Sequence, residues 1–356
     1  MSKITKPILP TFPTLAEKLV RWQRTHGRHE LPWQNTHDAY RIWLSEIMLQ
    51  QTQVVTVLDY YARFLARFPT VNDLASADLD EVLALWAGLG YYSRARNLHA
   101  CAQAVVREFV GEFPRTPEQL QTLKGIGAST AAAIAVFAYA YPAAILDGNV
   151  KRILSRVYGI ADVPSAQTDK ILWQKAHDTL MTPADAAQLN IPFETALRAY
   201  TQGVMDLGSG LCRKNQPDCG ACPWQSDCVA YQTKRTHEIP AAKIRPVVKV
   251  MAFDWYIYRY QNQVWLEQQP ERGIWAKLWA FPQAARLKKT NTPKKLILIK
   301  HRLTHRALEI QPYLIELDEM VQMPQTGQWL DITADERLSV ALPKPAAGLI
   351  QAVFEW

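Results

Sequence analysis

The seventeen residues CRKNQPDCGACPWQSDC, which run from Cys212 to Cys228, contain four of the five cysteines of this 356-residue chain. Their spacing is C-x6-C-x2-C-x5-C, with Cys219 and Cys222 as the single close pair. Structural zinc sites usually have two close pairs separated by a longer loop, whereas one compact loop suits a [4Fe–4S] cluster. The spacing therefore favours an iron–sulfur cluster held by these four cysteines and leaves zinc as the alternative.

The composition indicates a globular protein and favours a polyanionic partner. Hydrophobic residues make up 48% of the chain, and the formal net charge is +7 with a pI near 9.1. Residues 1–14 lack the apolar core of a signal peptide, and the longest apolar run, 130–146, is too short to cross a bilayer. We therefore expect a cytoplasmic protein, and because that compartment keeps thiols reduced, clustered cysteines are interpreted as metal ligands. The isolated Cys101 is interpreted as a small buried apolar residue.

The chain changes character after residue 231. Up to that point apolar residues recur about every 3.6 positions, which predicts a helical domain over 1–231. Residues 232–247 are polar and basic and contain two prolines, which predicts a linker. The rest, 248–356, is rich in Val, Ile, Trp and Tyr and is interpreted as an α/β domain. The expected helices are 14–26, 39–67, 78–88, 93–110, 117–123, 129–140, 148–158, 193–207 and 344–355, and the expected strands are 248–260, 264–268, 296–299 and 308–317.

A glycine-rich turn, LKGIGAST (123–130), lies between two of the expected helices. Gly125 and Gly127 let the backbone turn sharply and expose successive N–H groups beside a helix N-terminus, which suits a DNA phosphate. Lys124 adds a positive charge there. The alternative is an ordinary helix–helix turn, and the cysteine cluster and the basic chain favour the phosphate site.

The turn of the L-x-G-[IV]-G type, Asp147 and the cysteine spacing together resemble the helix–hairpin–helix DNA glycosylase superfamily. Three further segments are similar to the adenine DNA glycosylases of that superfamily: LSEIMLQQTQV (44–54), GLGYYSRARNL (88–98) and DGNVKR (147–152). Members of that family remove adenine mispaired with 8-oxoguanine. The resemblance covers nearly the whole chain, because the family also has an additional C-terminal domain.

This resemblance implies a multidomain fold. An all-α helix–hairpin–helix glycosylase domain with a [4Fe–4S] loop is followed by an α/β Nudix-like domain. The helical domain divides into a six-helix subdomain, about 30–145, and an iron–sulfur subdomain built from the N-terminus and about 146–231. The implied partner is double-stranded DNA with 8-oxoguanine:A or G:A mispairs. We expect a monomer without membrane contact, in the cytoplasm of a bacterium and associated with the nucleoid through DNA.

Glu46 and Asp147 are the candidate catalytic carboxylates. Glu46 shares a helix face with Ile42, Trp43 and Leu49, and such apolar neighbours predict a raised pKa. The resemblance implies that Glu46 is the general acid that protonates adenine. Asp147 follows an apolar run and precedes a helix, which predicts an N-cap. The resemblance implies that it stays ionised beside the cationic sugar, with Asn149 placed to orient it.

Ser129 separates two classes of glycosylase. Bifunctional members of the superfamily have a lysine at this hairpin position, whose amine forms a Schiff base and cuts the strand. Serine cannot do so, and we therefore predict a monofunctional enzyme that uses water. Lys124 stands where many relatives have proline. The DNA contacts implied by the resemblance and the chemistry of the residues are Gln50, Gln51, Tyr91, Lys124, Gly125, Gly127, Ser129, Arg213 and Lys214.

The C-terminal domain resembles the Nudix-type domain with which the family senses 8-oxoguanine. We find no glutamate-rich R-E-x-x-E-E segment in it, and therefore predict no pyrophosphatase activity. The implied lesion contacts are Leu303, Thr304 and His305, where relatives often have Phe-Ser-His. Two alternatives remain. Ser129 disfavours an endonuclease-III-like lyase, and the complete pair of carboxylates disfavours a non-catalytic iron–sulfur DNA-binding protein.

Overall fold

The structure, a computed structural model, describes residues 13–242, 248–287, 292–304, 306–333 and 340–354. The chain forms two compact units. The first consists of Met1–Gln50 and Glu112–Ile244, and the second of Gln51–Gly111 and Arg245–Trp356.

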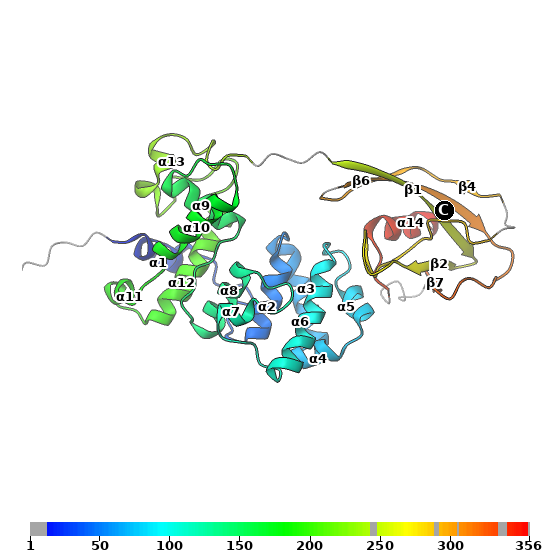
Figure 1. The fold of residues 1–356 in the computed structure, drawn as a ribbon, viewed down its shortest axis with the longest axis horizontal. Coiled ribbons are helices and arrows are strands. Elements are labelled where there is room, and N and C mark those ends of the chain that lie inside the picture. The colour runs from blue at the N-terminus through cyan, green and yellow to red at the C-terminus, as the bar shows by residue number, and fades with distance from the viewer. Residues whose placement is uncertain (1–12, 243–247, 288–291, 305, 334–339, 355–356) are drawn as a thin grey trace, which may run out of the picture. The chain divides into compact units, whose positions relative to one another are not determined.

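The first unit is helical (Figure 1). Six of its helices begin at a side chain that accepts a hydrogen bond from a backbone N–H of the first turn, and such a cap typically contributes about 1 kcal/mol. These caps are Thr14, Asp38, Thr116, Asp147, Ser165 and Thr182. The helices are α1 (Leu15–His26), α2 (Ala39–Leu49), α7 (Pro117–Leu120), α8 (Ala128–Tyr139), α9 (Gly148–Tyr158), α10 (Ala166–Asp178), α11 (Pro183–Leu189), α12 (Phe193–Asp206), the π-helix η1 (Leu207–Leu211), the 3-10 helix η2 (Gln225–Asp227) and α13 (Val229–Gln232).

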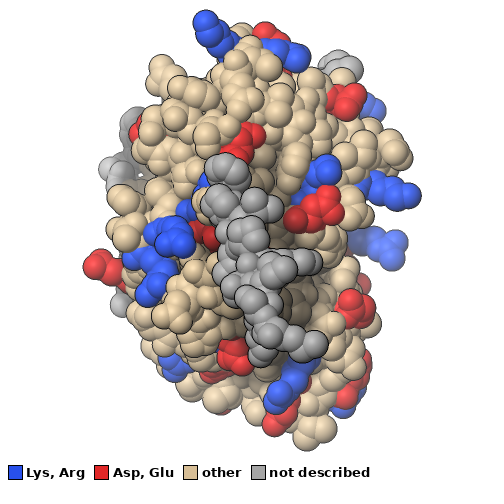
Figure 2. Space-filling view, turned by 90° about the vertical axis from the view of Figure 1, so that its left-hand side faces the viewer, with Lys and Arg blue, Asp and Glu red and all other residues tan. Residues whose placement is uncertain are grey.

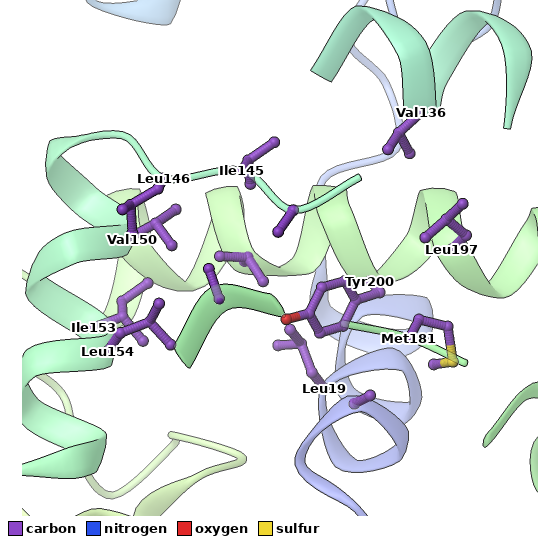
Figure 3. Close-up of a cluster of buried hydrophobic side chains, with 14 of the residues drawn as sticks. Leu19, Val136, Ile145, Leu146, Val150, Ile153, Leu154, Met181, Leu197 and Tyr200 are labelled. Carbon is purple, nitrogen blue, oxygen red and sulfur yellow. The ribbon is translucent and has the colours of Figure 1, made fainter. Parts of the chain in front are cut away.

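The core of this unit holds the segment that leads into α9. Ile145 and Leu146 come from that segment, and their side chains point into the same cluster as Val150 on α9 and Tyr200 on α12 (Figure 3). Each of these four residues is at least nine-tenths buried. Full burial of a leucine or isoleucine side chain stabilises the fold by about 1.5–3 kcal/mol. The backbone just before Asp147 is therefore fixed by packing on both sides.

The described part of the second unit contains a sheet, four helices that come before it in the chain and one that comes after it. The four helices before the sheet are α3 (Val54–Arg67), α4 (Val71–Ser76), α5 (Leu79–Leu85) and α6 (Ser93–Phe109). Phe64 packs edge-on against Phe68 and Trp86, with 5.7 Å between ring centroids in each pair. The hydroxyl of Tyr60 donates to the carbonyl of Ala87 at 2.6 Å and so holds the turn after α5.

The sheet of the second unit is mixed. Its order is β3-β2-β1-β6-β4, with β5 also paired to β6 and β7 to β2. β1 and β6 run parallel, from the pair Lys249 and Arg306 to the pair Arg259 and Glu316. The last helix, α14 (Lys344–Phe354), buries apolar residues in the same core as the strands. The strands are β1 (Lys249–Tyr260), β2 (Gln263–Gln268), β3 (Trp279–Ala280), β4 (Lys294–Lys295), β5 (Ile299–Arg302), β6 (Arg306–Glu316) and β7 (Gly327–Asp331).

Most expected elements are present, but the structure differs in several of them. The expected helix 39–67 is two helices, because the chain leaves helical geometry after Leu49 and Gln51 has a φ of +58°. The expected strand 296–299 is replaced by β4 and β5. The elements that were not expected are helices α4, α10, α11, α13, η1 and η2 and strands β3 and β7. In α10 the buried positions Thr168, Leu172 and Ala176 recur only once per turn, a stripe narrower than the usual apolar face.

The segment predicted as a linker, 232–247, is described up to residue 242. Ile239 within it is buried, and its carbonyl accepts a hydrogen bond from Arg156 Nε at 2.9 Å. Its described part therefore packs against the first unit. The domain boundaries at 231 and 248 stay a prediction.

Candidate active site

Glu46 occupies the middle of α2, half-buried among residues that are almost all buried. Ile42, Trp43 and Met48 are each at least 98% buried. Burial and, to a smaller degree, the negative charge of Asp147 together raise the pKa of Glu46 from 4.5 to about 7. A raised pKa was expected from the apolar neighbours.

Asp147 caps the N-terminus of α9. Its Oδ1 accepts from the backbone N–H groups of Asn149 at 2.9 Å and Val150 at 2.8 Å. The helix dipole at this end also favours a negative charge. The carboxylate is exposed, and it is near enough to Glu46 to perturb that group's pKa. The predicted N-cap is therefore present, and the first unit brings the two carboxylates together.

Asn149 lies in a chain of hydrogen bonds along α9. Its Nδ2 donates to Asp147 Oδ2 at 3.5 Å, and its Oδ1 accepts from Arg152 Nη2 at 2.9 Å. Arg152 also donates to the carbonyls of Gly208 at 2.7 Å and Cys212 at 2.8 Å. Sequence reasoning quoted Arg152 in a motif but gave it no role. Its position one helical turn after Asn149 was the available signal.

The segment before Asp147 is held by the glycine-rich turn. The Oγ of Ser129, in the first turn of α8, accepts from the backbone N–H of Leu146 at 3.0 Å. Residues 140–147 belong to no helix or strand, so this N–H has no ladder partner. Next to it in the sequence, the hydroxyl of Thr130 accepts from Gln50 Nε2 at 3.4 Å.

The turn itself has the geometry expected of an anion site. Gly125 has a φ of +86°, which favours glycine, and Gly127 is the residue before α8. A Cβ added at Gly127 would meet no atom within 4 Å, so the space beside this helix N-terminus is open. Lys124 and both glycines are exposed. On the part of the face in Figure 2 that the described residues form, basic and acidic side chains are interspersed.

The four clustered cysteines line one pocket. Their thiols are free, and the pocket wall also contains Leu207, Trp224 and Arg156. Arg156 Nη1 donates to Cys212 Sγ at 3.3 Å and to the carbonyl of Arg213 at 2.7 Å. Its Nη2 donates to the carbonyl of Lys214 at 3.1 Å. Among the described residues, no group of three His, Cys, Asp or Glu side chains was found that could hold a metal ion. Four thiols around one pocket, with a donor to a sulfur atom, nevertheless fit a multi-atom iron–sulfur group.

The other expected DNA contacts lie at strained or exposed positions. Gln50 ends α2, and Gln51 and Tyr91 both have positive φ, at +58° and +49°. Arg213 and Lys214 are exposed, and the guanidinium of Arg213 donates to the carbonyl of Gln216 at 3.2 Å. Strained backbone is often found at functional sites, because the surrounding structure must maintain it.

The second unit brings Tyr91 together with part of the expected lesion loop. The hydroxyl groups of Tyr91 and Thr304 lie 3.3 Å apart, and Leu303 packs partly against the sheet core. His305 lies outside the described residues. Arg94, to which the sequence assigned no role, is buried. Its guanidinium lies 5.6 Å from the Tyr91 ring centroid and donates to Thr52 Oγ1 at 3.1 Å.

Comparisons with known proteins agree with this architecture. Residues 44–177 match the HhH-GPD superfamily of base excision DNA repair proteins, and residues 255–352 match the NUDIX domain. The solved structure of a thermostable thymine-DNA glycosylase superposes with a TM-score of 0.52 and 24% identity, over 61% of this chain and 95% of that one. The fold class is thus confirmed as an HhH-GPD helical domain followed by a Nudix-like domain.

Full-length relatives narrow the class. An adenine DNA glycosylase of Buchnera aphidicola subsp. Baizongia pistaciae is 35% identical over 349 residues, which cover 95% of this chain and 96% of the relative. The human adenine DNA glycosylase is 42% identical over 234 residues, 63% of this chain and 40% of its own length. The chain belongs to the adenine DNA glycosylase family. No described helix has the length and hydropathy needed to cross a membrane.

Proposed function

We propose that this chain hydrolyses the N-glycosidic bond of adenine mispaired with 8-oxoguanine or guanine in double-stranded DNA. The observation that supports it most directly is the pairing of Glu46, whose pKa is about 7, with Asp147 at the N-cap of α9. One group can give a proton at neutral pH, and the other presents a carboxylate held by backbone N–H groups.

Glu46 acts as the general acid in this proposal. A proton passes from its carboxyl group to the adenine ring, which makes the base a better leaving group as the glycosidic bond breaks. General acid catalysis of this kind contributes about 10²–10⁴-fold when the pKa lies near the working pH. The pKa of Glu46, at about 7, meets that condition.

Asp147 stabilises the positive charge that develops on the sugar. Two backbone N–H groups fix Oδ1, and Asn149 contacts Oδ2, so the carboxylate need not reorient during the reaction. Water then adds to the sugar and completes the hydrolysis. Fixed dipoles and charges of this kind are typically the largest single contribution to such catalysis.

The same site supports a monofunctional enzyme. Ser129 has no amine, and its hydroxyl already accepts the N–H of Leu146. A Schiff base with the sugar would need a nucleophilic lysine at this position. Lys124 lies near the start of the turn, five residues before Ser129, and is exposed. We therefore propose base release without strand cleavage.

Excision requires the adenine to leave the base stack, which costs a few kcal/mol. We propose that Lys124, Gly125, Gly127 and Ser129 hold phosphate at the turn, with Arg213 and Lys214 on a neighbouring phosphate. Gln50, Gln51 and Tyr91 fill the gap left by the adenine. Open space at Gly127 and the exposed charges support these contacts.

We propose a [4Fe–4S] cluster bound by Cys212, Cys219, Cys222 and Cys228. When bound, it supplies a rigid link that shapes the DNA-facing loop, and the base-release chemistry uses none of its electrons. Arg156 supports this assignment, because it donates to Cys212 Sγ and to the backbone carbonyls of Arg213 and Lys214. Iron analysis and a broad visible absorption band would test it, and a colourless, zinc-loaded protein would contradict it.

We further propose that Leu303, Thr304 and His305 of the Nudix-like domain read 8-oxoguanine, and that the protein acts as a cytoplasmic monomer. The proximity of Thr304 to Tyr91 supports the role of this loop. The deciding experiment presents duplexes with A opposite 8-oxoguanine, A opposite G, and thymine glycol. We expect abasic sites from the two adenine mispairs without strand breaks. Release of thymine glycol, or efficient borohydride trapping on DNA, would instead favour the endonuclease-III-like alternative.

A further inference from the structure

We propose that Ser129 is a positioning residue for Asp147, and that the first turn of α8 thereby couples the DNA-binding turn to the geometry of the two carboxylates. The inference rests on the proposed function of this site. It assigns to Ser129 a task in the excision step that is separate from phosphate contact.

The hydrogen bond from Leu146 to Ser129 is the central observation. Leu146 is buried, and its backbone N–H donates to Ser129 Oγ at 3.0 Å. An unsatisfied buried N–H is costly, so the bond fixes the backbone at this point. The next residue is Asp147, whose backbone position sets where its carboxylate lies. A shift of the peptide at Leu146 would therefore be passed directly to the charged group.

The side chain of Ser129 does not cap its own helix, which is the usual role of a serine near a helix N-terminus. α8 begins at Gly127 without a side-chain cap, and the Ser129 hydroxyl makes its bond to a segment seventeen residues away. The rest of the helix, 131–139, is composed of Ala, Ile, Val, Phe and Tyr. Serine has a lower helix propensity than alanine, so propensity does not explain a serine at this position. The long-range hydrogen bond does.

The neighbouring Thr130 extends the same arrangement to the other carboxylate. Its hydroxyl accepts from Gln50, which follows the last turn of the helix that bears Glu46. This contact is long, at 3.4 Å, and is the weaker of the two. One helical turn thus contacts both chain segments that carry the carboxylates. A phosphate bound at Gly125 and Gly127 would steady that turn.

The pKa of Glu46 depends on the position of Asp147, and a variant that only destabilises the fold would not change this pKa. The negative charge of Asp147 is one of the two causes that raise the pKa of Glu46. If Asp147 moves away, the pKa of Glu46 falls toward its usual range. The descending limb of the pH–rate profile, which reports loss of the Glu46 proton, would then shift to lower pH.

The experiment compares Ser129→Thr with Ser129→Val in the full-length protein. These side chains have the same shape and differ in the hydroxyl group. We measure single-turnover adenine excision from pH 5 to pH 9, affinity for the uncleaved duplex at fixed salt, and thermal unfolding. A misplacement near 1 Å can cost about 10²-fold in rate, so we expect about 10–100-fold slower excision in Ser129→Val. We expect Ser129→Thr to retain most of the rate. The rates are measured at saturating protein, so that a weaker phosphate contact in Ser129→Val does not enter the comparison.

Thr122→Ala is the matched control. Its hydroxyl lies in the same hairpin, is exposed and donates to the carbonyl of Gln119 at 2.7 Å, with no bond to the Asp147 segment. Equal rates for Ser129→Val and Ser129→Thr, or an unmoved pH limb in Ser129→Val, would overturn the positioning role while leaving the proposed function intact. If the valine variant does not fold, Ser129→Cys, a weaker acceptor, gives the same test, and wild-type behaviour of that variant would overturn the role. Failure of the wild-type protein to release adenine would instead contradict the proposed function.

Discussion

Two helices of the first unit hold a carboxylate each, in opposite environments. α2 carries Glu46 at mid-helix among buried apolar residues, and α9 carries Asp147 at its exposed N-terminus with two N–H donors. Burial favours the protonated form of an acid, and a helix N-terminus favours the charged form. In the proposed function, the same functional group gives a proton in one place and presents negative charge in the other.

Glu46→Gln should have the largest effect on this pair. The amide keeps the shape of the side chain but has no acidic proton, so excision should fall by about 10²–10⁴-fold with DNA binding preserved. Single-turnover excision and an equilibrium binding assay measure the two properties. Glu194→Gln is the control, because Glu194 is exposed in a surface pair with Arg198 on α12. Wild-type excision by Glu46→Gln would contradict the acid role.

Asp147→Asn should follow, with a loss of about 10²–10³-fold from the missing charge. Asparagine is also a good N-cap, so the melting temperature should change little. Asp38→Asn provides a matched comparison, since Asp38 caps α2 through the N–H groups of Tyr40 and Arg41. Both variants should fold alike, and Asp147→Asn alone should lose excision. Parallel losses in both would mean that capping, and not charge at the sugar, explains the effect.

The wild-type pH profile should show the difference between the two environments directly. The proposed acid role makes the protonated form of Glu46 the active one, so the single-turnover rate should be highest below its pKa of about 7 and fall as pH rises through that value. Above that pKa the rate should fall by at most about tenfold for each pH unit. The residual rate of Glu46→Gln should lack this limb. A flat wild-type profile from pH 5 to pH 9 would count against Glu46 as the acid.

Arg152→Met should have the smallest effect of the four, about tenfold, because its hydrogen bonds reach Asp147 through Asn149 and not directly. Excision should slow more than DNA binding weakens. The control is Arg198→Met, whose guanidinium donates to a backbone carbonyl of another helix, that of Phe137, at 3.1 Å. If both arginine variants behave alike, the contact with Asn149 has no special part in excision.

The sequence predicted local features of the fold and site better than long-range ones. The N-cap at Asp147 and the raised pKa of Glu46 followed from neighbours within a few residues. Arg152 has one local partner, Asn149, which the sequence could have indicated. Its other partners are the backbone carbonyls of Gly208 and Cys212, more than fifty residues away. Such carbonyls have no signature in the amino-acid sequence.

Element boundaries show the same limit. The apolar spacing of 39–67 is continuous, so the interruption after Leu49 could not be read from it. Gln51 adopts a left-handed conformation that its residue type does not demand, which only the surrounding structure can impose. The predicted catalytic, DNA-contact and lesion-contact roles stay predictions until the variants are measured.

The alanine-rich composition of α8 has an entropic consequence. Ala131, Ala132, Ala133, Ala135 and Ala138 are all at least nine-tenths buried. An alanine loses no side-chain rotamers on folding, whereas a buried leucine or isoleucine loses about 0.5–1 kcal/mol of conformational entropy. The five alanine positions of α8 are therefore ordered at no cost in side-chain entropy, although the backbone entropy is lost as in any helix. The first turn of α8, which contacts the Asp147 segment, thus continues into a stretch in which most side chains have no rotamers to change.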